Sequence, residues 1–244
     1  MISNITDTNK RSQNEDNYFH ALKYVKGKRI IIAAVFDGMG GTDLGEKASE
    51  MAKSSVENFF INNSINCTKW FPDELKNKLS ELILDINKKI YIYGKENDVS
   101  LGTTAVLMII YDNEYLLANV GDSRAYKFSA KNIQLTKDQT LAQREVDKGN
   151  LTKEEALTDK RSHVLTQALG YLEPPEIGFY KGKLKNKDYI LLCSDGMYNR
   201  MPIQEMAEII KNTTLDGQDK LIELAVTAKK KGEKDNITGI LIET

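Results

Sequence analysis

The chain has 244 residues, of which 41% are hydrophobic and 28% charged, and 34 basic against 35 acidic residues leave a formal net charge of −1. This composition is that of a soluble globular protein, and the charge balance gives no electrostatic reason to expect nucleic acid or an anionic membrane as the main partner. The first residues show no secretory signal and the apolar runs are too short to cross a bilayer, so we expect a cytoplasmic protein without membrane insertion.

Cysteine and histidine are scarce, which limits the chemistry that the chain can perform. Cys67 and Cys193 are expected to be free in a reducing cytosol, and Cys193 lies in an apolar run typical of a buried position. The only histidines are His20 and His163. A metal site in this chain would therefore be built mostly from oxygen ligands.

The first half of the chain predicts a buried strand followed by two helices. The β-branched run 29–36 is typical of a strand buried on both faces, and we expect it to end in a glycine-rich turn at 37–41. A second helix should begin at Pro72, since proline suits the first helical turn. The apolar positions expected to face the core are, for the first helix, Leu44, Ala48, Met51, Ser55 and Phe59, and for the second Leu75, Leu79, Leu82, Ile86 and Ile90.

The second half predicts groups of strands separated by pairs of helices. The expected strands are 103–110, 115–120, 124–128, 189–193 and 237–242, with a hairpin turn at 112–113. The expected helical segments are 140–157, broken at 149–150, then 202–211 and 217–229. Without regular βα alternation, and without repeats or linkers, this order favours one domain, residues 1–244. Its expected fold class is α+β, a four-layer αββα sandwich of two mainly antiparallel sheets with helices on the outer faces.

Acidic residues recur beside small residues at the ends of the expected strands. Because such loops project carboxylates from a rigid scaffold, they suit a site for Mg²⁺ or Mn²⁺, which prefer oxygen ligands. Any one Asp-Gly pair is more often an ordinary turn, so the signal lies in the set. The set comprises Glu15-Asp16, Asp37-Gly38, Gly121-Asp122, Asp195-Gly196 and Asp235-Asn236.

These acids also lie within a series of motifs that runs from Arg11 to Thr238. In order, the motifs are Arg11-Ser12-Gln13-Asn14-Glu15-Asp16, Asp37-Gly38-Met39-Gly40-Gly41, Leu101-Gly102-Thr103-Thr104, Ala118-Asn119-Val120-Gly121-Asp122-Ser123-Arg124, Cys193-Ser194-Asp195-Gly196 and Lys234-Asp235-Asn236-Ile237-Thr238. In order and separation the series resembles the bacterial type of the metal-dependent protein serine/threonine phosphatases of type 2C, the PPM family.

The resemblance implies two or three cations per chain, Mn²⁺ or Mg²⁺, held on aspartates. Asp37 is expected to bridge two cations, and Asp195 and Asp235 to complete the site of the first. The Gly38 carbonyl and Glu15 are expected to serve the second, directly or through water. The implied reaction is in-line hydrolysis of phosphoserine or phosphothreonine by a hydroxide held between two cations.

Further residues are assigned by the same resemblance. Asp16 is expected to support the metal ligands from behind, and Asp122 with Asp195 resembles the pair that holds a third cation in bacterial members. Arg11 should clamp the substrate phosphate, a task that suits its planar fork. Segment 139–170 resembles the bacterial flap, in which His163 falls where some members place a residue near the third metal.

Three positions depart from the family pattern. Gln139 and Thr42 stand where many members carry histidine, and Met39 stands where the eukaryotic type has a histidine proposed as general acid. These departures leave the identity of the proton donor open, with metal-bound water as one candidate. The resemblance further implies a monomer that acts on phosphorylated proteins and opposes a Ser/Thr kinase.

Other phosphatase chemistries do not fit the sequence. After Cys193 the arginine, Arg200, comes one residue too late for a tyrosine-phosphatase loop, and an aspartyl nucleophile would need a second Asp where Met39 stands. The glycines of 38–41 lack the Gly-Lys-Ser/Thr ending of a P-loop. Two alternatives stay open: a partner-switching phosphatase with one dedicated protein substrate, and a pseudophosphatase binding module.

Overall fold

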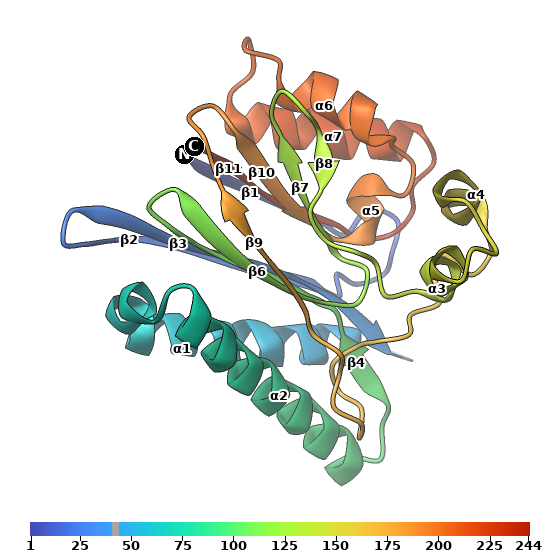
Figure 1. The fold of residues 1–244 in the computed structure, drawn as a ribbon. Coiled ribbons are helices and arrows are strands. Elements are labelled where there is room, and N and C mark those ends of the chain that lie inside the picture. The colour runs from blue at the N-terminus through green and yellow to red at the C-terminus, as the bar shows by residue number, and fades with distance from the viewer. Residues whose placement is uncertain (41–43) are drawn as a thin grey trace.

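Two antiparallel sheets packed face to face form the centre of the structure, a computed structural model that describes residues 1–40 and 44–244 (Figure 1). One sheet has the strand order β1-β11-β10-β7-β8. The other has the order β2-β3-β5-β6-β9, with the short β4 also paired to β3. The strands are β1 (Ile2–Asp7), β2 (Asp16–Val25), β3 (Lys28–Gly40), β4 (Leu101–Thr103), β5 (Ala105–Tyr111), β6 (Glu114–Val120), β7 (Arg124–Phe128), β8 (Ile133–Gln134), β9 (Gly178–Lys183), β10 (Tyr189–Cys193) and β11 (Ile237–Glu243).

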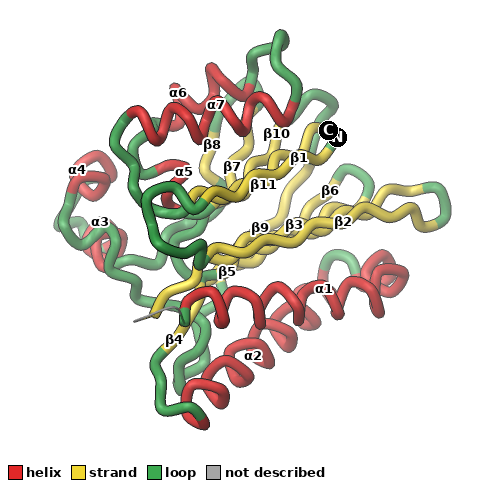
Figure 2. Tube along the Cα trace, turned by 180° about the vertical axis from the view of Figure 1, so that it is seen from behind, coloured by secondary structure: helices red, strands yellow, loops and turns green. Residues whose placement is uncertain are grey.

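Helices cover the outer face of each sheet, so the predicted α+β class and four-layer αββα sandwich are confirmed (Figures 1 and 2). The pair α1 (Gly45–Trp70) and α2 (Asp73–Glu96) packs on the larger sheet, and α6 (Ile203–Ile210) with α7 (Gly217–Lys230) on the smaller. The remaining helices are α3 (Leu141–Asp147), α4 (Lys153–Thr158) and α5 (Asp195–Tyr198). None of the helices in the described ranges is long and apolar enough to cross a membrane.

Strand β3 is central because both of its faces are apolar. The side chains of Ile30, Ile32 and Phe36 pack toward α1 and α2, whereas Ile31 and Val35 pack between the two sheets. All of residues 30–36 are at most 1% exposed, as the continuous apolar run predicted. Burial of this run from water is the main local contribution to its stability.

The turn predicted at 37–41 is wrong for the residues that the structure describes. Strand β3 continues through Gly40, and its last residues pair with β4, Gly38 with Thr103 and Gly40 with Leu101. The glycines are needed for close packing rather than for reversal of the chain: a Cβ atom at Gly38 would overlap the backbone of Gly45 and Glu15. Residues 41 and 42 of the motif lie outside the described ranges.

Both predicted helices of the first half are present. In α2 the expected stripe is buried except for Leu82, which is partly exposed while its neighbour Ile83 is buried. In α1 the buried face is displaced by about one position from the expected one, because Ala52, Val56 and Phe60 contact the sheet. Small and β-branched residues on this face allow the helix to approach β3 closely.

The remaining predicted elements are confirmed, but five strands were not predicted from the sequence: β1, β2 and β9, and the short β4 and β8. The hairpin of β5 and β6, the break between α3 and α4, and the elements β7, β10, α6, α7 and β11 all lie where expected. The three longer strands among them, β1, β2 and β9, are mixtures of polar and apolar residues with partial burial. They lie at sheet edges, where one side of a strand faces solvent and the apolar pattern is weak.

Candidate functional site

Five aspartates meet at one end of the sandwich, brought there by strands of both sheets. Asp16 begins β2 and pairs across the sheet with Asp37 of β3. Asp122 follows β6, Asp195 begins α5 just after β10, and Asp235 lies just before β11. Since adjacent antiparallel strands end and begin at the same edge, residues far apart in the sequence become neighbours there.

The Asp37 backbone is fixed by two adjacent threonines. Its amide donates to Oγ1 of Thr104 at 3.0 Å, and its carbonyl accepts from the Thr104 amide at 2.9 Å. The Thr103 hydroxyl donates to the same carbonyl at 3.0 Å. The second hydroxyl of the pair, that of Thr104, also contacts Ser123 Oγ at 2.7 Å, so the aspartate is held on a rigid base.

The carboxyl groups destabilise one another's charge. Burial, followed by the negative charges of Asp16 and Asp195, raises the pKa of Asp37 well above its usual value. Burial raises the pKa of Asp16 to about 7 and that of Asp195 to about 6, and in each case Asp235 adds to the effect. Burial and Asp195 raise the pKa of Asp122 in the same direction. Such mutual elevation is typical of carboxylates gathered to receive a cation.

Asp16 lies behind the other acids and joins the two sheets. Its Oδ2 atom accepts a 2.7 Å hydrogen bond from the Ser194 hydroxyl, which in turn accepts from the Thr238 amide at 3.1 Å. Ser194 is fully buried and directly precedes Asp195. The supporting role predicted for Asp16 agrees with this position, although the structure does not test it.

Glu15 lies at the beginning of α1. Its Oε1 atom accepts from the Gly45 amide at 3.1 Å, and its carbonyl accepts from the Gly38 amide and from the Ser49 hydroxyl. A negative side chain is favourable at this position because the first amides of a helix carry partial positive charge. These hydrogen bonds place the Gly38 backbone beside the Glu15 carboxylate. Such proximity is required if both residues are to serve the same cation.

Arg11 forms a two-pronged ion pair with a predicted metal ligand. Its Nε and Nη2 atoms lie 2.9 and 2.6 Å from the two carboxylate oxygens of Asp235. The pair is partly exposed, with 56% of the Arg11 side chain accessible. Asn236 holds the Arg11 loop in place, since its side-chain amide donates to the carbonyls of Thr8 and Gln13 at 3.0 and 2.9 Å. The guanidinium fork is thus aimed into the cluster.

Asp122 is supported by a buried cation. Arg124 pairs with Asp138 at 2.6 Å and stacks on the Tyr198 ring at 3.6 Å from its centroid. The Tyr198 hydroxyl donates to the Asp122 carbonyl at 3.0 Å. The side-chain oxygen Oε1 of Gln139 accepts from the backbone amide of Gly121 at 2.7 Å, so the glutamine that departs from the family pattern braces this turn.

The flap-like segment lies beside the acids, and His163 belongs to it. A bridge from Thr103 of β4 to Leu169 ties the end of this segment to the sandwich, and a bridge from Thr140 to Leu165 joins the two ends of the segment to each other. His163 is exposed and close enough for its charge to lower the pKa of Asp195. The structure therefore places it near the cluster without assigning it a ligand role.

The residues present fit a divalent cation. Among residues 1–40 and 44–244, no three His, Cys, Asp or Glu side chains are close enough as they lie to enclose an ion. The donors are nevertheless carboxylate and carbonyl oxygens, which Mg²⁺ and Mn²⁺ prefer, and their raised pKa values show that positive charge would stabilise them. The cysteines offer no alternative, because both are buried and burial raises the pKa of Cys67 to about 12.

Several supporting residues were not identified from the sequence. Ser194 and Asn236 each lie beside an assigned acid in a recognised motif, and this adjacency was the available signal; Thr104 lies in the recognised motif 101–104, which contains no acid. Tyr198 and Gln139 gave none, because their contacts with residues 121 and 122 depend on how distant segments pack.

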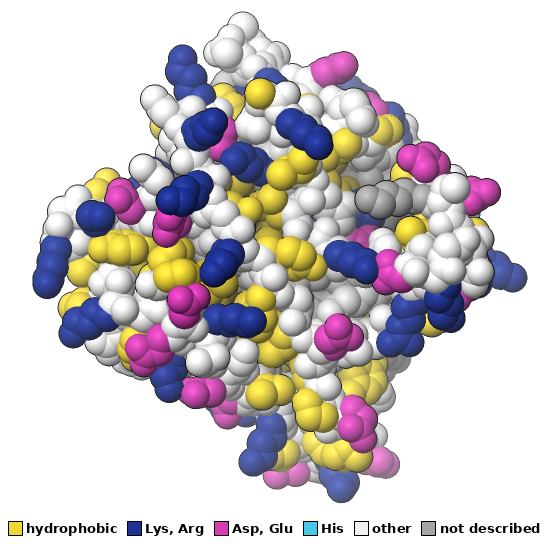
Figure 3. Space-filling view, viewed as in Figure 1, with side chains coloured by type: hydrophobic (Ala, Val, Ile, Leu, Met, Phe, Trp, Pro, Cys, Tyr) yellow, Lys and Arg dark blue, Asp and Glu magenta, His cyan; other side chains and the backbone are white. Residues whose placement is uncertain are grey.

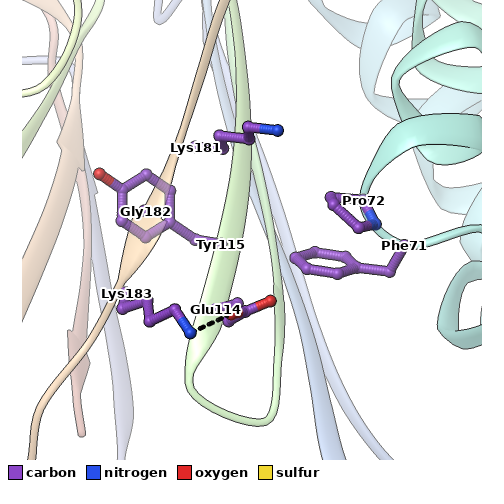
Figure 4. Close-up of a pocket in the computed structure, with 7 residues that line it drawn as sticks. All are labelled: Phe71, Pro72, Glu114, Tyr115, Lys181, Gly182 and Lys183. Atoms are coloured by element: carbon purple, nitrogen blue, oxygen red, sulfur yellow. Dashed lines mark ion pairs between the residues drawn. The ribbon is translucent and has the colours of Figure 1, made fainter.

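A cavity at the opposite end of β6 from Asp122 has different chemistry. It encloses about 290 Å³ and is lined by Phe71, Pro72, Glu114, Tyr115, Lys181, Gly182 and Lys183. Figure 4 shows its Lys183–Glu114 ion pair, with Phe71 and Pro72 on the facing wall. None of these residues belongs to the acidic cluster.

Comparison with known proteins agrees with this geometry. The family model for protein phosphatase 2C matches residues 8–221. The serine/threonine phosphatase stp of Listeria monocytogenes is 35% identical over 237 residues, covering 96% of this chain and 91% of that protein. The crystal structure of the serine/threonine phosphatase Stp1 from Staphylococcus aureus superimposes with a TM-score of 0.86 at 29% identity, covering 100% and 95% of the two chains.

A further solved structure contains metal. The catalytic domain of the serine/threonine protein phosphatase PstP, in complex with two manganese ions, matches with a TM-score of 0.79 at 26% identity, covering 99% and 96% of the chains. Family model and relatives together show that the chain belongs to the protein phosphatase 2C family of metal-dependent protein serine/threonine phosphatases.

Proposed function

We propose that residues 1–244 form one phosphatase domain, with a flap at about 139–170, that removes phosphate from phosphoserine and phosphothreonine in proteins. The observation that supports this most directly is the convergence of Asp37, Asp122 and Asp195, with pKa values raised by burial and by one another, beside the fork of Arg11. Named serine/threonine phosphatases among the relatives do not favour the partner-switching or pseudophosphatase alternatives.

The metal ligands in this proposal are those that the sequence assigned. Asp37, Asp195 and Asp235 would hold one cation, and Asp37 with the Gly38 carbonyl and Glu15 would hold the other. Bound Mn²⁺ or Mg²⁺ supplies an activated water and neutralises charge on the phosphoryl oxygens. The relative crystallised with two manganese ions supports at least two ions per chain. Asp122 with Asp195 is proposed for a third, and His163 lies near it.

Arg11 binds and orients the substrate phosphate. In the structure its fork is parallel to the carboxylate of Asp235, with both nitrogen–oxygen distances below 3 Å. A phosphoryl group offers the same pair of oxygens, so it can take over the fork while Asp235 turns to a cation. The loop carrying Arg11 is held by Asn236 and Asn9, which limits the movement that this exchange requires.

The biological setting follows from the same proposal. Substrates are phosphoproteins produced by a Ser/Thr kinase, so the enzyme takes part in signal transduction, and it acts as a monomer in the cytoplasm. The strand-bound acids form the reaction centre, and the flap, whose Leu169 is bridged to Thr103 of β4, borders it. This border is suited to exclude water from the bound phosphate.

Phosphate release from a phosphothreonine peptide tests the function. We expect turnover to vanish with excess chelator and to return on addition of Mn²⁺, and less strongly with Mg²⁺, because the ligand set is all oxygen. Unchanged turnover in excess chelator would exclude the metal mechanism. No release under any metal condition, from a protein that is folded and binds Mn²⁺, would favour the pseudophosphatase alternative.

Replacement of Arg11 by Ala should raise KM for the phosphopeptide and lower kcat. Hydrogen bonds to charged groups contribute about 1.5–3 kcal/mol, so kcat/KM should fall by roughly ten- to a hundredfold. Arg11→Lys should restore only part of this, since a lysine cannot form a two-pronged contact. Lys10→Ala is the matched control, because it removes one charge from the same loop. Equal kinetics for Arg11→Ala and Lys10→Ala would show that Arg11 does not hold the phosphate.

A further inference from the structure

Two lysine-rich segments lie at the end of the sandwich opposite the acidic cluster. Together they contain eight Lys or Arg and no Asp or Glu. The first, 23–29, forms the β2–β3 hairpin, and the second, 181–187, joins β9 to β10. They are adjacent, since Arg29 and Lys185 line one cavity of about 310 Å³. We call these two segments the basic end; their cations are Lys23, Lys26, Lys28, Arg29, Lys181, Lys183, Lys185 and Lys187.

Much of this positive charge is not neutralised locally. Asp112 of the β5–β6 turn and Glu114 at the start of β6 pair with Lys28 and Lys183 at 3.1 and 2.8 Å, and Asp73 lies 3.6 Å from Lys181. Within the described part of the chain, no ion pair involves Lys26, Arg29, Lys185 or Lys187. Because the whole chain carries a net charge of −1, a positive end implies a negative remainder and hence an oriented field.

Apolar side chains are exposed among these cations. Leu22 is 43% and Tyr24 69% exposed on β2, close to the tip of the hairpin. The ammonium of Lys23 lies 5.4 Å from the centre of the Phe60 ring of α1, so Lys23 is on the face of β2 that packs against this helix. Because side chains alternate along a strand, Leu22 and Tyr24 lie on the opposite face of β2. The hairpin projects beyond the rest of the sandwich in Figure 1, and Figure 3 shows dark blue side chains along that side of the molecule with magenta acidic ones between them.

We propose that the basic end is a peripheral docking surface for an anionic lipid bilayer. Seven of the eight cations are lysines, which act as point charges suited to a diffuse array of headgroups, whereas phosphate recognition in a fixed site favours the fork of arginine. The charges are spread over two loops rather than along a groove, which fits a flat, fluid partner. A tyrosine and a leucine between lysines are typical of segments that rest at the membrane interface.

This orientation would hold the reaction centre away from the lipid. Asp37 lies nine positions after Lys28 in β3, which corresponds to about 30 Å of extended strand. The acids would face the cytoplasm at that height. Phosphorylated segments a short distance above a membrane surface would then be favoured over the same segments free in solution.

Sedimentation with vesicles tests the docking surface on the full chain. We expect binding to vesicles of phosphatidylcholine mixed with phosphatidylglycerol, weakening with added salt, and none to phosphatidylcholine alone. The test variant combines Lys26→Gln, Arg29→Gln, Lys185→Gln and Lys187→Gln, and each lost charge should weaken binding about fivefold. The control combines Lys53→Gln, Lys88→Gln, Lys95→Gln and Lys230→Gln, which remove equal charge elsewhere and should leave most of the binding intact.

A second variant separates lipid from other anionic partners. Leu22→Ser with Tyr24→Ser keeps every charge, so it should weaken vesicle binding and leave binding to single-stranded DNA or polyglutamate unchanged. All variants should keep wild-type melting temperatures and turnover of a soluble phosphopeptide, so failure of the docking surface is distinguishable from failure of the phosphatase. Equal binding to both vesicle types, equal loss in test and control variants, or tighter binding to DNA or polyglutamate than to anionic vesicles would each overturn the proposal.

Discussion

Replacement of Asp37 by Asn should abolish turnover and leave the metal-free protein at least as stable as the wild type. The wild-type carboxylate is surrounded by Asp16, Asp195, Asp122 and Asp235, whose charges raise its pKa. Asparagine removes one of the like charges at nearly constant shape, so the metal-free fold loses an unfavourable interaction. The backbone contacts of residue 37 with Thr104 do not involve its side chain and should remain.

Whereas the metal-free Asp37→Asn protein should be at least as stable as the wild type, its stabilisation by bound metal should be smaller. Cations that bind only the folded chain stabilise it by about 2.7 kcal/mol at a hundredfold excess over the dissociation constant. In Asp37→Asn the rise in melting temperature caused by Mn²⁺ should therefore shrink. Melting curves of both proteins in chelator and in Mn²⁺, together with peptide turnover, measure the three effects.

Asp112→Asn is the matched control for this variant. Asp112 is an exposed aspartate in the β5–β6 turn, at the other end of the sheet, paired only with Lys28 on the surface. The control should keep full turnover and the full Mn²⁺ response. A variant at position 37 that melts lower in chelator and still responds fully to Mn²⁺ would show that Asp37 has a structural role instead.

The stability of the metal-free protein should fall as pH rises from about 4 to about 7. Burial raises the pKa of Asp16 from 3.8 to about 7 and that of Asp195 to about 6. The folded state therefore binds more protons than the unfolded state across this range, and its stability is lost as these protons leave. The loss should be on the order of a few kcal/mol, which corresponds to a decrease of several degrees in melting temperature.

Mn²⁺ should reverse the sign of this pH dependence. A cation binds the deprotonated carboxylates, so metal affinity and metal-induced stability rise with pH. Thermal unfolding of metal-stripped protein with and without Mn²⁺, across this pH range, measures both slopes. If the metal-free melting temperature were constant or rising between about pH 4 and about pH 7, the buried carboxyl groups would not have the raised pKa values described.

The sequence by itself identified the acidic residues that the fold brings together at one end of the sandwich. Motifs such as Asp37-Gly38 and Asp195-Gly196 are local, and a local pattern of acid and glycine can be recognised without knowledge of the fold. Strands buried on both faces, such as β3, could also be predicted from the sequence, because every position of such a strand is apolar. Edge strands such as β2 could not be predicted in this way, since the side chains on their solvent-exposed side can be polar and the apolar pattern is lost.

Only the tertiary structure decided how these residues act together. Thr104 holds Asp37, Gln139 holds the turn before Asp122, and Arg11 lies on Asp235, although 224 positions separate the last two. The distribution of charge also depends on the fold. The net charge of −1 gave no reason to expect a charged partner, whereas folding places the basic segments 23–29 and 181–187 side by side. Such contacts depend on strand register and on the packing of distant segments, and these are set by the burial of apolar surface across the whole chain rather than by any local run of residues.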